Sequence, residues 1–161
     1  SFKRFSDTLY TAWQARKKTH TLSFADTLSL AAIVEKEAQV KAEQATIASV
    51  YLNRLKIGMK LQADPTVAYA IGKPNKRIIT YKDLKVNSPY NTYRFKGLTP
   101  TPIASVGLDA FKAVLNPAKS DYLFFVATGN GSHKFSKTYK QHLIYQKEYH
   151  AWLKQTTRKS L

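Results

Sequence analysis

The chain has 161 residues, of which 43% are hydrophobic and 12% aromatic; this is enough for one domain with a real core and argues against disorder. It contains no cysteine, which excludes disulfides, thiolate zinc sites and cysteine nucleophiles. The 26 lysines and arginines against 10 acidic residues give a formal net charge of +16, which favours a polyanionic partner such as nucleic acid, an anionic membrane or an acidic wall polymer.

The basic residues are spread along the chain, and no nucleic-acid motif accompanies them. No metal-ligand spacing, P-loop or dinucleotide motif is present, so we expect no cofactor and no metal. No apolar run approaches the roughly 20 residues of a membrane span, and no signal peptide opens the chain. Because Phe5, Leu9 and Trp13 already follow helical spacing, we expect a fragment whose natural N-terminal part has been removed.

Three helices are predicted in the first part of the chain. The first runs from about Phe2 to Lys17. Ser23 and Asp26 form a capping pair for the second, from Phe24 to about Ala38, and the third covers about Ala42 to Ile57.

The segment from Met59 to Pro102 contains five prolines, is rich in Asn, Thr and Tyr, and is short on helical periodicity. A long polar and aromatic stretch inside a compact domain is usually functional. We therefore expect this segment to carry binding residues.

The last part of the chain predicts a short helix, a β-hairpin and a closing helix. The short helix covers Gly107 to Leu115, and the strand Tyr122–Thr128 is followed by a Gly-Asn-Gly turn and a returning strand, Ser132 to Phe135. From Ser136 onward the spacing of aromatic and leucine residues suggests an amphipathic helix. The predicted fold class is α+β, with several helices packed on a small β-sheet, in a single domain over residues 1–161.

Two glutamates close the second predicted helix. Glu35 and Glu37 are separated by about 200° of rotation on an α-helix, so they point to nearly opposite sides and cannot form a pair of carboxylates. Glu37 continues the apolar stripe of Leu30, Ile33 and Val34. A carboxyl group against apolar side chains has a raised pKa, which suits a general acid. The alternative is that Glu37 marks the point where the helix leaves the core and is solvated or paired with a neighbouring lysine.

Two polar stretches follow in the proline-rich segment. Asp64 precedes a proline and lies between two hydrogen-bonding residues, Gln62 and Thr66. Its carboxyl group either belongs to a functional site or forms an Asx turn that starts the following segment. Residues 88–93, Ser-Pro-Tyr-Asn-Thr-Tyr, combine aromatic and polar side chains. That composition suits a carbohydrate-binding rim and also a groove for single-stranded nucleic acid.

Several short blocks of sequence between roughly residues 25 and 150 match those of one known family in their order and spacing. They are Ile33–Glu37, Ile47–Leu55, Gly58–Val67, Pro89–Tyr93, Gly97–Pro100, Pro102–Ala104, Asn116–Lys119 and Tyr122–Val126, with His133 and Phe135 following the hairpin turn. Together they resemble the endolytic murein transglycosylases, or YceG-like family.

The resemblance implies a lytic transglycosylase. Such an enzyme cleaves the β-1,4 bond between N-acetylmuramic acid and N-acetylglucosamine within glycan strands and leaves 1,6-anhydro ends. The family's catalytic glutamate corresponds to the second glutamate of its block, Glu37. The expected substrate-binding residues are Gln62, Asp64, Tyr90, Asn91, Thr92 and Tyr93. A non-catalytic glycan-binding module is the alternative.

The resemblance also implies partners and a location. Peptidoglycan glycan strands are the expected partner, peptidoglycan synthases are a further one, and nucleic acid is not expected. The family's single membrane helix and its LysM-like subdomain precede the catalytic domain and are absent from these residues. The full-length protein is therefore expected in the inner membrane, with this domain in the periplasm or outside the cytoplasmic membrane.

Overall fold

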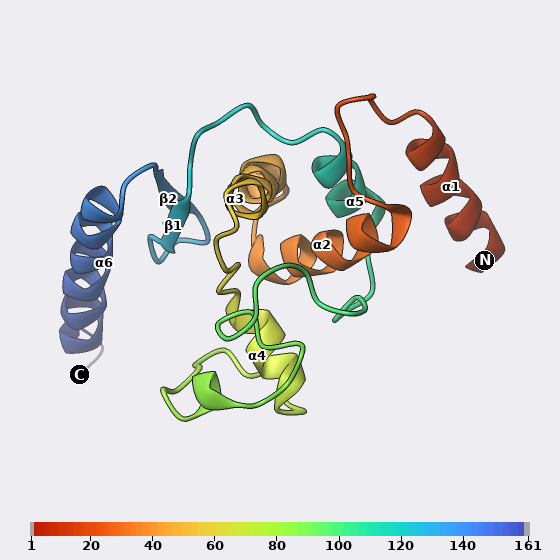
Figure 1. The fold of residues 1–161 in the computed structure, drawn as a ribbon. Coiled ribbons are helices and arrows are strands. Elements are labelled where there is room, and N and C mark those ends of the chain that lie inside the picture. Colours follow the sequence, from red (N-terminus) through yellow and green to blue (C-terminus); the bar gives the residue numbers. More distant parts are fainter. Residues whose placement is uncertain (1, 160–161) are drawn as a thin grey trace.

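The computed structural model describes residues 2–159, so residues 1, 160 and 161 of the predicted domain lie outside it. The described residues form six α-helices and a two-stranded antiparallel sheet, which confirms the α+β class (Figure 1). The helices are α1 (Phe2–Gln14), α2 (Phe24–Glu37), α3 (Gln44–Lys56), α4 (Asp64–Ala70), α5 (Leu108–Leu115) and α6 (Tyr139–Lys159). The strands are β1 (Phe124–Ala127) and β2 (His133–Ser136), and short 3-10 turns cover Lys41–Glu43 and Asp83–Lys85.

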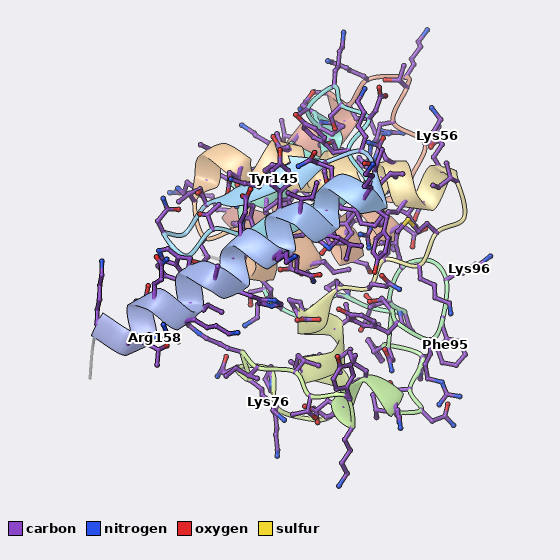
Figure 2. All side chains as sticks on the ribbon, turned by 90° about the vertical axis from the view of Figure 1, so that its left-hand side faces the viewer. Lys56, Lys76, Phe95, Lys96, Tyr145 and Arg158 are labelled. Atoms are coloured by element: carbon purple, nitrogen blue, oxygen red, sulfur yellow. The ribbon has the colours of Figure 1, made fainter. Side chains whose placement is uncertain are left out.

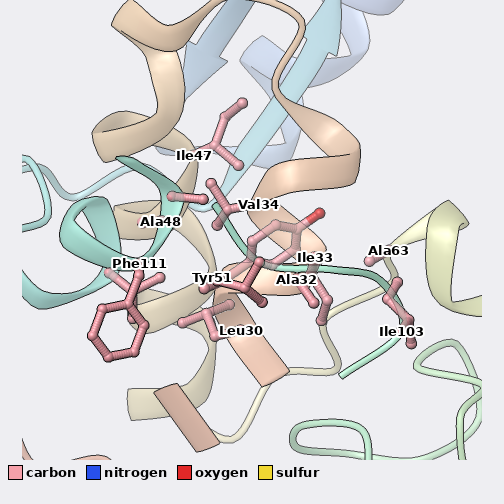
Figure 3. Packing of buried hydrophobic residues seen from close by; sticks show 14 of the residues in the cluster. Leu30, Ala32, Ile33, Val34, Ile47, Ala48, Tyr51, Ala63, Ile103 and Phe111 are labelled. Atoms are coloured by element: carbon pink, nitrogen blue, oxygen red, sulfur yellow. The ribbon is translucent and has the colours of Figure 1, made fainter. Parts of the chain in front are cut away.

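The core lies where α2, α3 and α5 pack together. Figure 3 shows Leu30 and Val34 of α2 among Ile47 and Tyr51 of α3 and Phe111 of α5, and all five are almost completely buried. A buried side chain of this size contributes roughly 1.5–3 kcal/mol of hydrophobic free energy. Because α2 is buried along most of its length, its last turn is held firmly against α3.

The predicted hairpin is confirmed. Strand β1 pairs with β2 from Phe124 opposite Ser136 to Ala127 opposite His133. The turn between them contains Gly129 with a φ of 100°, a conformation that side chains other than glycine rarely adopt.

The hairpin lies between the core and the last helix. On one face, the ring of Phe125 meets that of Tyr51 edge to face at 5.8 Å. On the other face, Phe124 stacks on His142 of α6 at 5.1 Å. Figure 2 shows α6 lying across the front of the hairpin.

Two predictions about elements need correction. The segment from Met59 to Pro102 contains a helix, α4, that is only seven residues long. Pro65 lies in its first turn, where a backbone N–H would have no partner within the helix, so the proline costs no hydrogen bond. The aromatic and leucine residues of α6 were expected on a buried face, but no described residue of α6 is buried. The narrow hairpin does not cover a whole helix face, so Leu143 and Trp152 remain exposed.

Some boundaries also differ from the prediction. Helix α1 ends at Gln14, three residues before the expected end, and α3 begins at Gln44 because the three residues before it form a 3-10 turn. The predicted cap of α2 is present, since the Asp26 N–H donates to Ser23 Oγ at 3.0 Å. No helix within residues 2–159 is both long and apolar enough to cross a membrane.

Candidate active site

A cleft of about 350 Å³ opens between the end of α2, the start of α4, and the hairpin with α6. Its polar lining residues are Glu37, Tyr51, Arg54, Gln62, Asp64, Tyr93, His133, Tyr139, His142 and Gln146. A wider hollow of about 640 Å³ runs along α1, but it is an open surface lined chiefly by that one helix. The cleft is therefore the stronger candidate, because distant parts of the chain bring polar groups together there.

Glu37 is the last residue of α2 and reaches the cleft from the core side. The hydroxyl of the fully buried Tyr51 donates to Glu37 Oε1 at 2.9 Å. Burial raises the pKa of Glu37 to about 7, and the negative charge of Asp64 acts in the same direction. The Tyr51 hydrogen bond and the positive charge of Arg54 oppose this rise. Near neutral pH, Glu37 is therefore present in both the protonated and the ionised form.

Glu35 has a different environment. It accepts a hydrogen bond from the Gly107 N–H at 3.2 Å and another from Gln44 Nε2 at 3.4 Å. These bonds tie α2 to the start of α5 and to α3. Of the two glutamates, Glu37 lines the cleft and Glu35 does not.

Arg54 holds the walls of the cleft together. Its Nε donates to the carbonyl of Leu123 at 2.7 Å, and its Nη1 donates to that of Leu61 at 2.6 Å. The guanidinium also lies over the ring of Phe124, 5.4 Å from its centre. One buried side chain of α3 thus fixes both the segment before α4 and the segment that enters β1.

Gln62 has the single positive φ, 51°, among the described residues other than glycine. Such a conformation costs roughly 1–2 kcal/mol for a residue with a side chain. The strand-like pairing of its N–H with the Thr92 carbonyl, at 3.2 Å, holds the backbone there. The backbone of Gln62 is therefore held in place, and its exposed side chain lines the cleft.

Asp64 and Tyr93 form a pair on the outer side of the cleft. The Tyr93 hydroxyl donates to Asp64 Oδ1 at 2.5 Å. Burial, followed by the charge of Asp64, raises the pKa of Tyr93, so this hydroxyl stays protonated and remains a donor. Asp64 is also the first residue of α4, which fixes its backbone relative to the cleft.

The other predicted binding residues lie behind the cleft. Asn91 is completely buried; its amide donates to the carbonyls of Leu84 and Val86 at 2.9 Å and accepts from the Tyr93 N–H at 3.0 Å. This placement suits a support of the cleft wall and differs from the expected contact with a sugar.

Thr92 and Tyr90 are likewise engaged within the protein. The Thr92 hydroxyl accepts from the Ala63 N–H at 2.9 Å and lies 2.7 Å from the Thr66 hydroxyl. The Tyr90 hydroxyl lies 2.7 Å from that of Thr101. Neither side chain lines the cleft.

Sequence patterns did not single out several residues of the cleft. Tyr51 lies in the predicted third helix and was given no role in a site, although a buried tyrosine needs a partner for its hydroxyl, and that requirement is a usable signal. His133 was given no role; its Nδ1 lies 2.9 Å from Glu43 Oε1. His142 stacks on a phenylalanine, and burial lowers its pKa, which favours the neutral ring.

No group of three or more His, Asp or Glu residues within residues 2–159 could hold a metal ion. The chemistry that this cleft can supply from its own side chains is proton transfer at Glu37, beside the carboxyl group of Asp64, the hydroxyls of Tyr51 and Tyr93 and the guanidinium of Arg54.

Comparison with known proteins gives consistent results. The profile of the YceG-like family matches residues 1–148. The chain is 48% identical over 130 residues to the endolytic murein transglycosylase of Bacillus subtilis (strain 168), covering 81% of this chain and 36% of that protein. It is 39% identical over 114 residues to the endolytic murein transglycosylase of Streptococcus pneumoniae (strain D39), covering 68% and 21%.

A crystal structure of a yceG-like protein from Listeria monocytogenes superposes with a TM-score of 0.74 at 43% sequence identity, covering 88% of this chain and 44% of that one. The chain thus spans about a third or less of the length of the curated relatives named above. The profile match extends over most of the chain, and the chain belongs to the YceG-like family.

Proposed function

We propose that this domain is an endolytic peptidoglycan lytic transglycosylase with Glu37 as its catalytic residue. The reaction would cleave the β-1,4 bond between N-acetylmuramic acid and N-acetylglucosamine inside a strand. The observation that carries the proposal is the state of Glu37: a carboxyl group in a cleft, with a pKa raised to about 7 by burial. The names of the relatives from B. subtilis and S. pneumoniae support the substrate class.

In the first step, protonated Glu37 donates its proton to the oxygen that bridges the two sugars. The bond from this oxygen to C1 of the muramyl residue breaks, and positive charge develops at C1. Because Tyr51 donates to Oε1, the second carboxyl oxygen, Oε2, is the one left to face the substrate. The carboxylate of Asp64 lies in the same cleft and would stabilise the positive charge.

In the second step, the Glu37 carboxylate takes the proton from the 6-hydroxyl of the same muramyl residue, and that oxygen bonds to C1. The product is a 1,6-anhydro end, and no water is consumed. Burial raises the pKa of the Tyr51 hydroxyl, so it stays a donor and stabilises the carboxylate between the two steps. One carboxyl group can therefore act first as acid and then as base.

Gln62, Asp64 and Tyr93 would position the sugar, since they line the cleft. Asn91 and Thr92 would act indirectly, by holding the backbone on which these side chains stand. The proposal also places the domain outside the cytoplasmic membrane, where murein lies, joined in the longer protein to a single membrane helix. Peptidoglycan synthases would then be neighbours of the enzyme.

The test is mass analysis of purified peptidoglycan strands after incubation with this chain and with a chain of the relatives' length, each beside Glu37→Gln and Glu35→Gln variants. We expect internal fragments whose mass is one water lower than that of hydrolysis products. The rate at which they form should fall by a factor of roughly 10² to 10⁴ in Glu37→Gln and not in Glu35→Gln. Because the acid must be protonated in the first step, activity should fall above about pH 7.

Three outcomes would contradict the proposal. Loss of product in Glu35→Gln but not in Glu37→Gln would assign the catalytic role to Glu35, on the opposite side of α2. Hydrated products would indicate a hydrolase and direct attention to Asp64 as a second catalytic carboxylate. Binding without any product, from the shorter and the longer chain alike, would indicate a glycan-binding module.

A further inference from the structure

A second hollow of about 510 Å³ lies beside the cleft. Asp64 and Tyr93 line both spaces, so the hydrogen-bonded pair they form is a shared wall. The rest of the second hollow consists of Ile79, Thr80, Tyr81 and Leu84, which follow α4 in the chain. The hollow therefore extends the space around Glu37 toward the loop that precedes the Asp83–Lys85 turn.

This loop is held in place although its side chains are exposed. Asp83 Oδ2 accepts from Lys76 Nζ at 2.6 Å and from the Thr80 N–H at 3.0 Å, while the Asp83 N–H donates to Thr80 Oγ1 at 3.1 Å. The buried amide of Asn91 holds the carbonyl of Leu84. A backbone bonded at this many points is held in one conformation.

Large apolar side chains project from this fixed loop into solvent. Tyr81 is 87% exposed and Ile78 is 79% exposed, the highest values among the large hydrophobic residues whose side chains the structure describes. The faces of sugar rings are apolar enough to stack on an aromatic ring whose face is open to solvent. Tyr81 offers such a ring, and it lines the hollow that shares the Asp64–Tyr93 wall with the cleft of Glu37.

The chain segment that contributes most of the hollow is strongly basic. From Lys73 to Lys96 the chain contains seven lysines and arginines and one acidic residue, Asp83, which is already paired with Lys76. Figure 2 labels Lys76 at the lower edge of this part of the molecule and Lys96 at its right-hand side. A ligand with an apolar ring face and carboxylate groups is complementary to an aromatic floor with cationic side chains around it.

We propose that this hollow is a subsite for a peptide-bearing amino sugar of the glycan strand, with its ring on Tyr81 and the carboxylates of its peptide toward the basic side chains around it. The subsite rests on the proposed function, since the strand that occupies it is the one that Glu37 would cleave. It would recognise a strand that still carries its acidic peptides and would hold that strand beside the scissile bond.

The test measures binding of strands to the protein with the Glu37→Gln substitution, so that no turnover is needed. Peptide-bearing strands are compared with strands stripped of their peptides. In that background, Tyr81→Ala is compared with Tyr10→Ala, an exposed tyrosine on α1. Arg77→Gln with Lys82→Gln is compared with Lys17→Gln with Lys18→Gln, a pair of exposed basic residues beyond α1 with the same change in charge.

We expect Tyr81→Ala to weaken binding of both kinds of strand by about five- to tenfold, and Tyr10→Ala to leave it unchanged. The substitution of Arg77 and Lys82 should weaken binding of peptide-bearing strands only. Equal affinities for the Tyr81 and Tyr10 variants, or equal losses for the two charge pairs, would overturn the subsite. If the strands bound as expected but neither this chain nor the longer one without the substitution gave any product, the proposed function would fail while the subsite would stand.

Discussion

The surroundings of Glu37 disfavour the ionised form of its carboxyl group. Its pKa is raised from 4.5 to about 7, chiefly by burial. The folded protein therefore binds this proton more tightly than the unfolded chain does. The stability that depends on it is fully present below about pH 4.5 and is lost as the pH rises toward 7. At the pH of its proposed reaction, the charged form of Glu37 destabilises the fold.

Replacing Glu37 with glutamine should accordingly stabilise the protein. Glutamine keeps the shape and can still accept the Tyr51 hydrogen bond, but it carries no buried charge. We expect the free energy of unfolding to rise by about 1–3 kcal/mol at pH 8 and to change little at pH 4. Urea unfolding at the two pH values measures this difference.

Glu35→Gln is the matched control, because it removes the same charge from the same helix. Glu35 accepts hydrogen bonds from Gly107 and Gln44, so its loss should leave stability unchanged or lower it by up to about 1 kcal/mol. Equal stabilisation by both substitutions would mean that the burial of Glu37 is not the cause.

Helical spacing separated Glu37 from Glu35, because the two lie on nearly opposite sides of α2 and Glu37 continues the line of Leu30, Ile33 and Val34. The partners of Asn91 and Thr92 could not be predicted in that way. Thr92 meets Thr66, 26 residues earlier, and these contacts depend on how an irregular segment folds back on itself. Polar residues near a site can bind a ligand or brace the backbone, and local sequence does not separate the two roles.

At the scale of elements, regular periodicity decided which parts were predictable. The helices of the core and the hairpin with its Gly-Asn-Gly turn have strong local patterns, and the structure contains them. Helix α4 has only two turns and a proline, too few residues for a periodic pattern to stand out. Helix α6 was predicted as an element, but its packing depends on the width of the hairpin beneath it.

The contact between Gly129 and Trp152 should control how firmly α6 is held. A Cβ atom at Gly129 would lie 2.3 Å from the Trp152 ring, so Gly129→Ala should push α6 off the hairpin. We expect faster amide hydrogen exchange throughout α6 and unchanged exchange in α2 and α3. Hydrogen-exchange mass spectrometry measures this.

Gly131→Ala separates the clash from backbone strain. Gly131 also has a positive φ, 91°, but the nearest atom to an added Cβ would be Gln39 Oε1 at 3.5 Å. This substitution should strain the turn by roughly 1–2 kcal/mol and leave exchange in α6 unchanged. If both variants loosened α6 equally, the cause would be strain in the turn and not a clash with the Trp152 ring.

At the scale of the whole molecule, the cleft joins parts of the chain that lie far apart. Glu37 comes from α2, Gln62 from the segment before α4, Asp64 from the first residue of α4, and His142 from α6, more than a hundred residues after Glu37. Figure 1 shows the three regions arranged around the centre of the molecule, with α4 on one side and α6 on another. Only the folded chain brings the α6 residues to the site, which is why sequence patterns left them out.

The net charge of +16 acts on the molecule as a whole. Peptidoglycan carries carboxylates on its peptides, so the protein's positive potential should add to whatever the cleft itself contributes to binding. Raising the salt concentration from about 0.05 to 0.5 M shortens the screening length from roughly 14 to 4 Å. Affinity of the Glu37→Gln protein for peptide-bearing strands should then fall by on the order of tenfold.

Neutral oligomers of N-acetylglucosamine provide the comparison for this last prediction. They can occupy the cleft through hydrogen bonds and stacking but carry no charge, so their affinity should be almost independent of salt. Calorimetric titration of both ligands at the two salt concentrations separates the long-range charge effect from the contacts in the cleft. Equal salt dependence for the two ligands would show that the net charge does not contribute to the binding of peptide-bearing strands, and a different partner would then have to account for the charge of +16.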